Sequence, residues 1–155
     1  MAVHTETKPK ASGIGARFAD KVVLITGGTR GIGRAVALKM AAEGARLALG
    51  FFKSRQKAKE TENEVKALGA ECLMVRGNLA NPESIQKMFG EVQETYGRLD
   101  IFVANAAMAM FGPTLEMSLE DWKLTLDANI TSFYLSSKEA AKMMAGHKEI
   151  GRAHV

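Results

Sequence analysis

The stretch with the clearest chemical meaning is the glycine loop, Thr26–Gly33, which reads TGGTRGIG. It follows a β-branched apolar run and precedes a segment with helical spacing, so it is expected to join a strand to a helix N-terminus. Gly27 would let the chain turn sharply, and Gly31 and Gly33 would let the backbone come close to a ligand and to the sheet. The free N–H groups at that helix end would hold a pyrophosphate; a turn that merely needs glycine is the alternative. The loop residues expected to contact the ligand are Gly27, Thr29, Arg30, Gly31, Ile32 and Gly33.

A basic loop after the second apolar run indicates which dinucleotide would bind. In folds that prefer NAD, an acidic residue near the end of the second strand binds the ribose 2′-hydroxyl. No Asp or Glu occurs between residues 46 and 59, whereas Lys53 and Arg55 do, and Arg30 lies in the glycine loop. Because a 2′-phosphate suits such cations, the sequence predicts NADP(H), with Arg30 and Arg55 as preferred contacts and Lys53 as a further one. Ordinary solvated loop charges are the alternative.

The rest of the chain alternates short apolar runs with segments of helical periodicity. The expected strands are 21–27, 46–51, 71–75 and 99–105, and the expected helices are 31–45, 54–69, 81–97 and 118–144, the last being one long helix or a helix pair. This alternation predicts an α/β fold, a doubly wound parallel sheet of the Rossmann type with strand order 3-2-1-4. The fold would be truncated after the fourth strand and the following helix. The fourth strand would then lie at an open edge although its residues are apolar enough for a central position.

The composition is that of one ordinary globular domain of 155 residues, with 46% hydrophobic and 25% charged residues. The net charge of +4 comes from basic residues interleaved with Glu, which favours a solvated surface over a nucleic-acid site. Cys72 is the only cysteine, so no intrachain disulfide is possible and a reducing cytoplasm is expected. No apolar run is long enough to cross a membrane. Residues 1–19 are predicted to be a disordered leader, and 20–145 to be part of a single dinucleotide-binding domain.

The spacing T-G-x-x-x-G-I-G in the glycine loop resembles that of the short-chain dehydrogenases/reductases. Three later motifs occur in the family's order: RGNLANPES at 76–84, ANAAM at 104–108 and DANI at 127–130. The resemblance extends from about residue 19 to about residue 144. It implies an NADP(H)-dependent oxidoreductase that moves hydride between the nicotinamide and a carbonyl or double-bond carbon, and a homotetrameric parent protein.

The resemblance also assigns roles to residues within these motifs. Asn78 stands where the family usually has an Asp beside the adenine, and its carbonyl could accept from the adenine amino group. Residues 105–107 would lie beside the nicotinamide ribose, with Ala107 in place of the family's glycine. Asn129 would be the asparagine of the family's catalytic set; an ordinary helix asparagine is the alternative. After the glycine loop, the expected cofactor contacts are Lys53, Arg55, Asn78, Leu79, Asn105, Ala106 and Ala107.

Tyr134 and Lys138 have the Tyr-x-x-x-Lys spacing that the family uses for acid/base chemistry, but they are predicted not to be that pair. The family's pair follows a fifth strand and a catalytic serine, whereas these two lie about a turn after Asn129 in the same predicted helix. They are expected to be i, i+4 neighbours on a helix face. Ser136 and Ser137 are likewise expected to be ordinary helix residues. The chain by itself would therefore lack the acid/base and be inactive, although its parent would be an enzyme.

Residues 149–155 are predicted to be foreign to the gene. Within the string EIGRAHV, Ile150–Val155 match one reading frame of a common short-read sequencing adapter completely, just where the family resemblance fails. We therefore expect Glu149–Val155 to be adapter read-through in a truncated reading frame; a divergent natural tail is the alternative. His147 and His154 are given no role as ligands, and no metal site is expected.

The resemblance leaves the substrate open. The segments GRLDIFVANAA and SKEAAKMM resemble bacterial reductases of acyl-carrier-protein substrates. Ala107 and Asn78 favour the FabL-type enoyl reductases, with the 3-oxoacyl reductases close behind. An acyl-thioester is thus the preferred small-molecule substrate, with a sugar or an alcohol as the alternative. Met108, Met110 and Met117 could line an acyl pocket or simply pack within a loop. A catalytically dead NADP(H)-binding module is a further alternative from another functional class.

Overall fold

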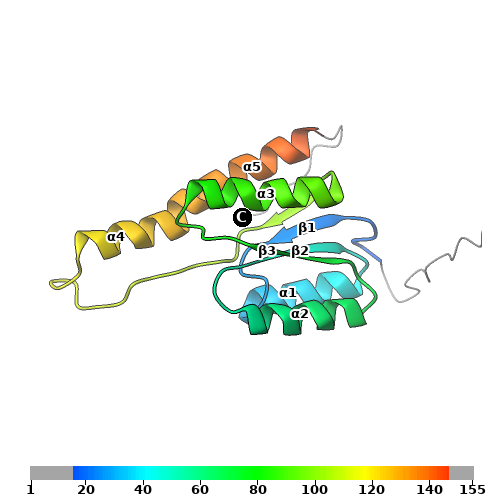
Figure 1. Cartoon of the computed structure of the whole chain (residues 1–155), viewed down its shortest axis with the longest axis horizontal. Helices are drawn as coiled ribbons and strands as arrows, with labels where there is room; N and C mark the ends of the chain where they lie inside the picture. The colour runs from blue at the N-terminus through cyan, green and yellow to red at the C-terminus, as the bar shows by residue number, and fades with distance from the viewer. Residues whose placement is uncertain (1–15, 147–155) are drawn as a thin grey trace, which may run out of the picture.

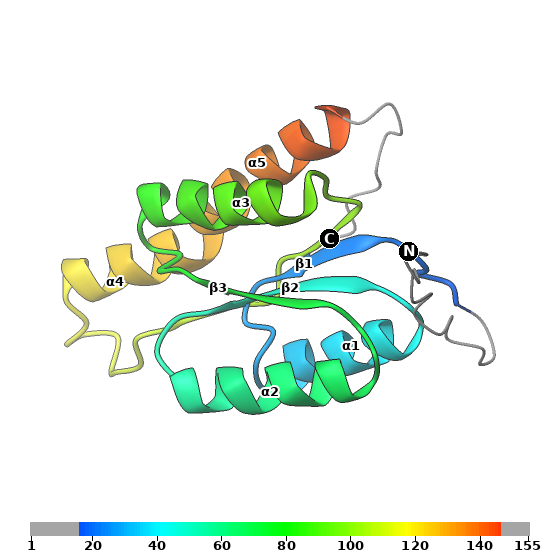
Figure 2. The same cartoon turned by 45° about the vertical axis from the view of Figure 1, so that its right-hand side comes forward.

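The computed structural model describes residues 16–146. A four-stranded parallel sheet with the order β3-β2-β1-β4 forms its middle layer. Helices α1 and α2 cover one face of this sheet, and α3 and α5 cover the other (Figures 1 and 2). The predicted α/β fold and the predicted strand order are confirmed.

The elements follow the predicted alternation closely. The strands are β1 (Val22–Ile25), β2 (Arg46–Phe51), β3 (Cys72–Arg76) and β4 (Ile101–Val103), and the helical segments are α1 (Gly31–Ala42), α2 (Arg55–Ala67), α3 (Pro82–Tyr96), α4 (Leu119–Leu126), the π-helical turn η1 (Asp127–Thr131) and α5 (Ser132–Gly146). The largest difference is β4, which is shorter than the apolar run 99–105. β4 pairs with β1 alone, so its ladder ends at Val103, opposite the last residue of β1.

Strand β1 is central because it contributes side chains to both cores. Val22 and Leu24 lie in the core under α3 and α5, whereas Val23 and Ile25 lie in the core under α1 and α2. Successive side chains of a strand point to opposite faces, and all four are fully buried. Since each buried aliphatic side chain stabilises the fold by roughly 1.5–3 kcal/mol, β1 fixes the position of the loop that follows it.

Capping residues define the helix ends. Asn81 Oδ1 accepts a hydrogen bond from the Ser84 N–H at 2.9 Å, and Ser118 Oγ accepts one from the Asp121 N–H at 3.0 Å. Helix α3 ends at Gly97, whose φ of 69° lies in the left-handed region that glycine adopts without strain. Local sequence therefore determines where α3 and α4 start and where α3 stops.

The folded domain begins before the predicted boundary at residue 19. The Arg17 guanidinium donates to a Glu43 carboxylate oxygen at 2.7 Å, and the Phe18 N–H donates to the Glu43 carbonyl at 3.1 Å. Phe18 also packs against the core under α1 and α2. The last residues of the polar stretch assigned to the leader thus contact the domain. The rest of that stretch, residues 1–15, and the segment 149–155 lie outside the described residues.

The Glu43→Gln variant is expected to be less stable than wild type at pH 7 but not near pH 2. Hydrogen bonding and charge from Arg17, with help from Lys39, outweigh the effect of burial and hold the pKa of Glu43 at about 2. This lies below the unfolded value of about 4.3, so the carboxylate's contribution is complete above that value and is lost as the pH falls toward 2. Urea unfolding at pH 7 and near pH 2 measures the difference. An equal loss of stability at both pH values would contradict this prediction.

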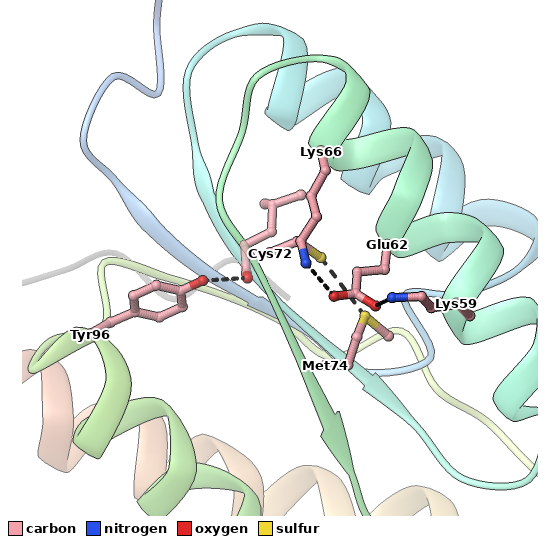
Figure 3. A network of polar contacts seen from close by, with 7 residues as sticks. Lys59, Glu62, Lys66, Cys72, Met74 and Tyr96 are labelled. Atoms are coloured by element: carbon pink, nitrogen blue, oxygen red, sulfur yellow. Dashed lines mark hydrogen bonds and ion pairs between the residues drawn. The ribbon is translucent and has the colours of Figure 1, made fainter. Parts of the chain in front are cut away.

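Cys72 lies half-buried on β3, beside a group of charged residues on α2 (Figure 3). Its Sγ is 3.8 Å from Sδ of Met74, and nearby Glu62 forms ion pairs with Lys59 and Lys66. Burial, assisted by the charge of Glu62, raises the pKa of the Cys72 thiol to about 11. The thiol is therefore protonated at neutral pH, where it is a poor nucleophile.

We expect Cys72 of the folded chain to react with Ellman's reagent far more slowly at pH 7.5 than the thiol of the urea-unfolded chain. Its pKa of about 11 leaves a much smaller thiolate fraction than the usual value of about 8.5. The rate should keep rising with pH up to about 11, as stopped-flow absorbance can follow. A rate that levels off near pH 8 would show an ordinary exposed thiol instead.

Candidate functional site

A cleft of about 720 Å³ opens at the carboxyl ends of the strands. It lies where α1 leaves β1 toward one face of the sheet while the chain after β4 leads to the other face (Figure 1). In open parallel sheets this switch point is where ligands bind. All the predicted cofactor contacts except Gly33 and Arg55 line the cleft. The contacts that line it are Gly27, Thr29, Arg30, Gly31, Ile32, Lys53, Asn78, Leu79, Asn105, Ala106 and Ala107.

Two glycines of the glycine loop, Gly27 and Gly33, have different structural roles. Gly27 has a φ of 64°, so it makes the sharp turn off β1 that the sequence predicted. Gly33 lies beneath the cleft: a β-carbon there would be 2.4 Å from the Gly27 carbonyl oxygen and 2.5 Å from Nδ2 of Asn105. Gly33 therefore allows α1 to pack against the glycine loop, and it does not itself form the cleft wall.

The glycine loop is tied to the end of β4 by Thr26 and Asn105. The Thr26 hydroxyl oxygen accepts from the backbone N–H groups of Asn105 at 3.0 Å and Ala106 at 3.1 Å. Asn105 Nδ2 donates back to the carbonyl oxygens of Thr26 at 2.9 Å and Gly27 at 3.2 Å. Sequence reasoning missed Thr26 and the structural part of Asn105. The available signal was the position of both residues at the ends of adjacent strands.

Helix α1 presents an N-terminus that no side chain caps. Its N-cap residue, Arg30, is extended and makes no side-chain capping hydrogen bond, and no acidic residue occurs in the first turn. The first N–H groups of the helix are thus available to an anion, which the helix dipole would also favour. Ile32, which is 78% exposed, lines the cleft beside them. The arrangement suits a ligand that combines phosphate with apolar surface.

Two glycines line the cleft near the ends of β2 and β3, where a side chain would collide with Met88. A β-carbon on Gly77 would lie 1.9 Å from Sδ of Met88, and one on Gly50 would lie 3.1 Å from Cε of the same methionine. Met88 is buried and forms part of the cleft floor, which sequence reasoning missed. Asn78 Oδ1 already accepts from the Ala80 N–H at 3.1 Å, so only its second lone pair can serve a ligand.

The mouth of the cleft is basic. Arg30, Lys53 and Lys57 line it, and no Asp or Glu is among the residues that form its walls within 16–146. Lys53 Nζ lies 5.8 Å from the centroid of the Phe52 ring, and both residues line the cleft. Arg55, a predicted phosphate contact, is exposed and does not line the cleft, whereas Lys57, which the sequence did not predict, does. The site therefore suits an anion at this end.

Asn129 lies in the π-helical turn η1, between α4 and α5. Its Nδ2 donates to the carbonyl oxygens of Met108 and, at 2.6 Å, Thr125, while its Oδ1 accepts from the Met108 N–H at 3.2 Å. The side chain thus holds the loop after β4 against the helix. π-Turns of this kind often mark functional positions.

Asn129 also lines a second cavity of about 150 Å³, which shares Thr26, Leu79 and Ala106 with the walls of the main cleft. The two cavities therefore adjoin at the ends of β1 and β4. Tyr134 and Lys138 line neither of them, and the Tyr134 side chain is 62% exposed. Ser136 lines the second cavity and Ser137 does not; both lie within α5.

No group of three or more His, Cys, Asp or Glu side chains within residues 16–146 could hold a metal ion. Over the same residues, no helix combines the length and apolar character that a membrane span requires.

Comparisons with known proteins agree with this geometry. The family model described as short chain dehydrogenase matches residues 21–153. The 3-oxoacyl-[acyl-carrier-protein] reductase of Synechocystis sp. is 34% identical over 128 residues, which are 83% of this chain and 52% of that protein. The trihydroxynaphthalene reductase of Colletotrichum orbiculare is 31% identical over 88% of this chain and 47% of its own length. The chain thus spans about half the length of the curated relatives it matches.

Solved structures give the same result. A short chain dehydrogenase from Burkholderia cenocepacia, in complex with NADP, superposes with a TM-score of 0.79 and 34% identity over 82% of this chain and 52% of that one. A short-chain dehydrogenase/reductase from Serratia marcescens gives a TM-score of 0.78 and 32% identity over 81% of this chain and 51% of its own. By its glycine loop, its sheet order and these matches, the chain belongs to the short-chain dehydrogenase family.

Proposed function

We propose that this chain forms the NADP(H)-binding part of an oxidoreductase that transfers hydride to or from a carbonyl or double-bond carbon. The observation that carries the proposal is the cleft at the switch point, where an uncapped helix N-terminus meets basic side chains and no carboxylate. The relative from Burkholderia cenocepacia, which was solved with NADP, supports the choice of cofactor.

The residues of the cleft would hold the parts of the dinucleotide in turn. The first N–H groups of α1 would bind the pyrophosphate, and Arg30 and Lys53 would pair with the 2′-phosphate. Asn78 and Leu79 would flank the adenine. Ala106 would face the nicotinamide ribose, because it lines both cavities where they adjoin. When bound, the nicotinamide supplies or accepts the hydride.

Asn129 would belong to the catalytic set at the nicotinamide end of the cleft. It lines the cavity that adjoins the cleft, and its amide fixes Met108, which lines the cleft itself. Tyr134 and Lys138 reach neither cavity, so the 155-residue chain would bind the dinucleotide without turning over a substrate.

The substrate we propose is an enoyl- or 3-oxoacyl-thioester of the kind used in fatty-acid synthesis. Relatives from Synechocystis sp. and Staphylococcus aureus are named 3-oxoacyl-[acyl-carrier-protein] reductases. The loop after β4 also carries exposed apolar side chains, among them Phe111 at 94% and Leu115 at 100%, which would suit an acyl chain. Because other relatives reduce or oxidise aromatic and steroid compounds by name, an alcohol or sugar is the second candidate.

A second candidate function is an NADP(H)-binding module without catalysis. The positions of Tyr134 and Lys138 outside both cavities favour it for the chain as it stands. For the parent protein, we propose a cytoplasmic homotetramer that assembles through the long helical segment α4–α5, whose exposed apolar side chains include Ile130 and Phe133. Analytical ultracentrifugation of the parent measures that state, and a monomer at micromolar concentration would refute it.

Isothermal titration calorimetry with NADPH and NADH tests the proposed cofactor, and absorbance at 340 nm with acetoacetyl- and crotonyl-thioesters tests the reaction. We expect the full chain to bind NADPH more tightly than NADH. A folded chain that binds neither dinucleotide would refute the proposal. Turnover of a thioester by the 155-residue chain would refute the inactive-fragment part of it, and binding without turnover would agree with both the fragment and the module.

A further inference from the structure

We propose that Lys57 is a specificity-determining residue for NADP(H), acting together with Arg30 on the 2′-phosphate. This inference rests on the proposed function, because it concerns the same cleft. The sequence predicted Arg55 for this role. Lys57 lies two residues later, about half a turn further along α2, and lines the cleft.

Helix geometry decides between Arg55 and Lys57. Both lie in the first turn of α2, two positions apart, and successive residues of an α-helix are rotated by about 100°. Side chains at i and i+2 therefore point to nearly opposite sides, so only one of the two can face the cleft. Lys57 lines the cleft, and Arg55, which is exposed, does not.

Thr61 shows what the Lys57 side of α2 faces. It lies one helical turn after Lys57, on the same side, and it is 1% exposed. Its Oγ1 donates to the carbonyl oxygen of Thr29 at 3.2 Å, which is in the glycine loop and next to Arg30. This buried hydrogen bond turns that side of α2 toward the glycine loop. Lys57 and Arg30 are thereby directed to the same end of the cleft.

The charges of α2 leave Lys57 available for an anion. Lys59 and Lys66 both pair with Glu62, whereas Lys57 forms no ion pair with any residue in 16–146. A cation in the first turn opposes the helix dipole, and α2 has no acidic residue there to compensate. A bound phosphate would offset both effects.

Ser54 adds a second donor at the same place. Its Oγ caps α2 by accepting from the Lys57 N–H at 3.4 Å, and it lines the cleft. A serine hydroxyl that accepts one hydrogen bond still carries a proton to donate. Lys57 and Ser54 thus offer a charge and a hydroxyl side by side, which is a suitable pair for a phosphate monoester.

The test compares Lys57→Gln with Arg55→Gln, a matched control in the same helical turn, in the full chain. Titration calorimetry at low salt should show that Lys57→Gln raises the Kd for NADPH about tenfold while changing the Kd for NADH less than about twofold. Arg55→Gln should leave both constants within about twofold of wild type, because Arg55 does not line the cleft. Lys57→Arg, which keeps the charge, should retain most of the NADPH preference.

The outcomes separate this inference from the proposed function. If Lys57→Gln weakens NADPH and NADH equally, or if Arg55→Gln causes the larger selective loss, Lys57 is not the specificity residue although the chain still binds NADP(H). If folded wild-type chain binds neither dinucleotide, the proposed function fails first. Circular dichroism of each variant establishes that α2 is intact, as expected for two exposed positions.

Discussion

Gly33→Ala is expected to raise the Kd for NADPH roughly 100-fold, which corresponds to about 2.8 kcal/mol of binding free energy. The new β-carbon would lie 2.4 Å from the Gly27 carbonyl oxygen and 2.5 Å from Nδ2 of Asn105. Both atoms belong to loops fixed at the ends of β1 and β4, so α1 must move away from the glycine loop. The first N–H groups of α1 would no longer converge on the pyrophosphate, and the overpacking would cost about 1–3 kcal/mol of stability.

The matched control for this variant is Gly90→Ala in α3. Apart from the backbone of its own helix and its chain neighbours, nothing lies within 4 Å of a β-carbon at Gly90, and alanine is favoured over glycine in a helix by about 1 kcal/mol. Calorimetry for NADPH and urea unfolding for stability measure both variants. If Gly33→Ala binds NADPH as wild type does, the close packing of α1 on the glycine loop is not what aligns the phosphate site.

Thr26→Val should lower the free energy of unfolding by about 2–6 kcal/mol and weaken NADPH binding with it. Valine has nearly the shape of threonine but accepts no hydrogen bond. Thr26 Oγ1 accepts hydrogen bonds from the backbone N–H groups of Asn105 at 3.0 Å and Ala106 at 3.1 Å. Both N–H groups would lose this acceptor in the valine variant. Thr26 is only 3% exposed. Each unsatisfied buried N–H costs about 1–3 kcal/mol.

Thr26→Ser retains the oxygen and removes only the methyl group, so it should cost about 1 kcal/mol. Urea denaturation of both variants, with NADPH titrations on the folded forms, makes the comparison. Similar losses for valine and serine would indicate that packing of the Thr26 methyl group, and not its two hydrogen bonds, holds the loops together.

The elements and their order were predictable because their signals are local. The β-branched run of β1, the glycine loop after it and the capping residues Asn81 and Ser118 each depend on neighbours within a few positions. Alternation of strands and helices then restricts the topology to few choices. The same local reasoning located most of the cleft, since parallel strands bring their carboxyl ends to one edge.

The features that escaped prediction depend on long-range geometry. Arg55 and Lys57 both carry a positive charge, and which of them faces the cleft follows from the start of α2, which the sequence does not fix to the residue. The role of Thr26 needs the loop after β4, far along the chain. Phe18 was assigned to the leader because the core it contacts is formed by later residues. The π-turn that carries Asn129 has no simple sequence signature.

The hydrogen bonds between Thr26 and Asn105 join residues 79 positions apart, and this separation sets an order of events during synthesis. A ribosome delivers β1, the glycine loop and α1 long before it delivers the end of β4. Until then, the phosphate site lacks the contacts that fix its backbone, and closing so large a loop is slow. A nascent chain is thus expected to gain affinity for NADPH late and abruptly, once the segment through Ala106 has emerged. Binding of NADPH would then indicate that the sheet is already assembled, and NADPH would not guide that assembly.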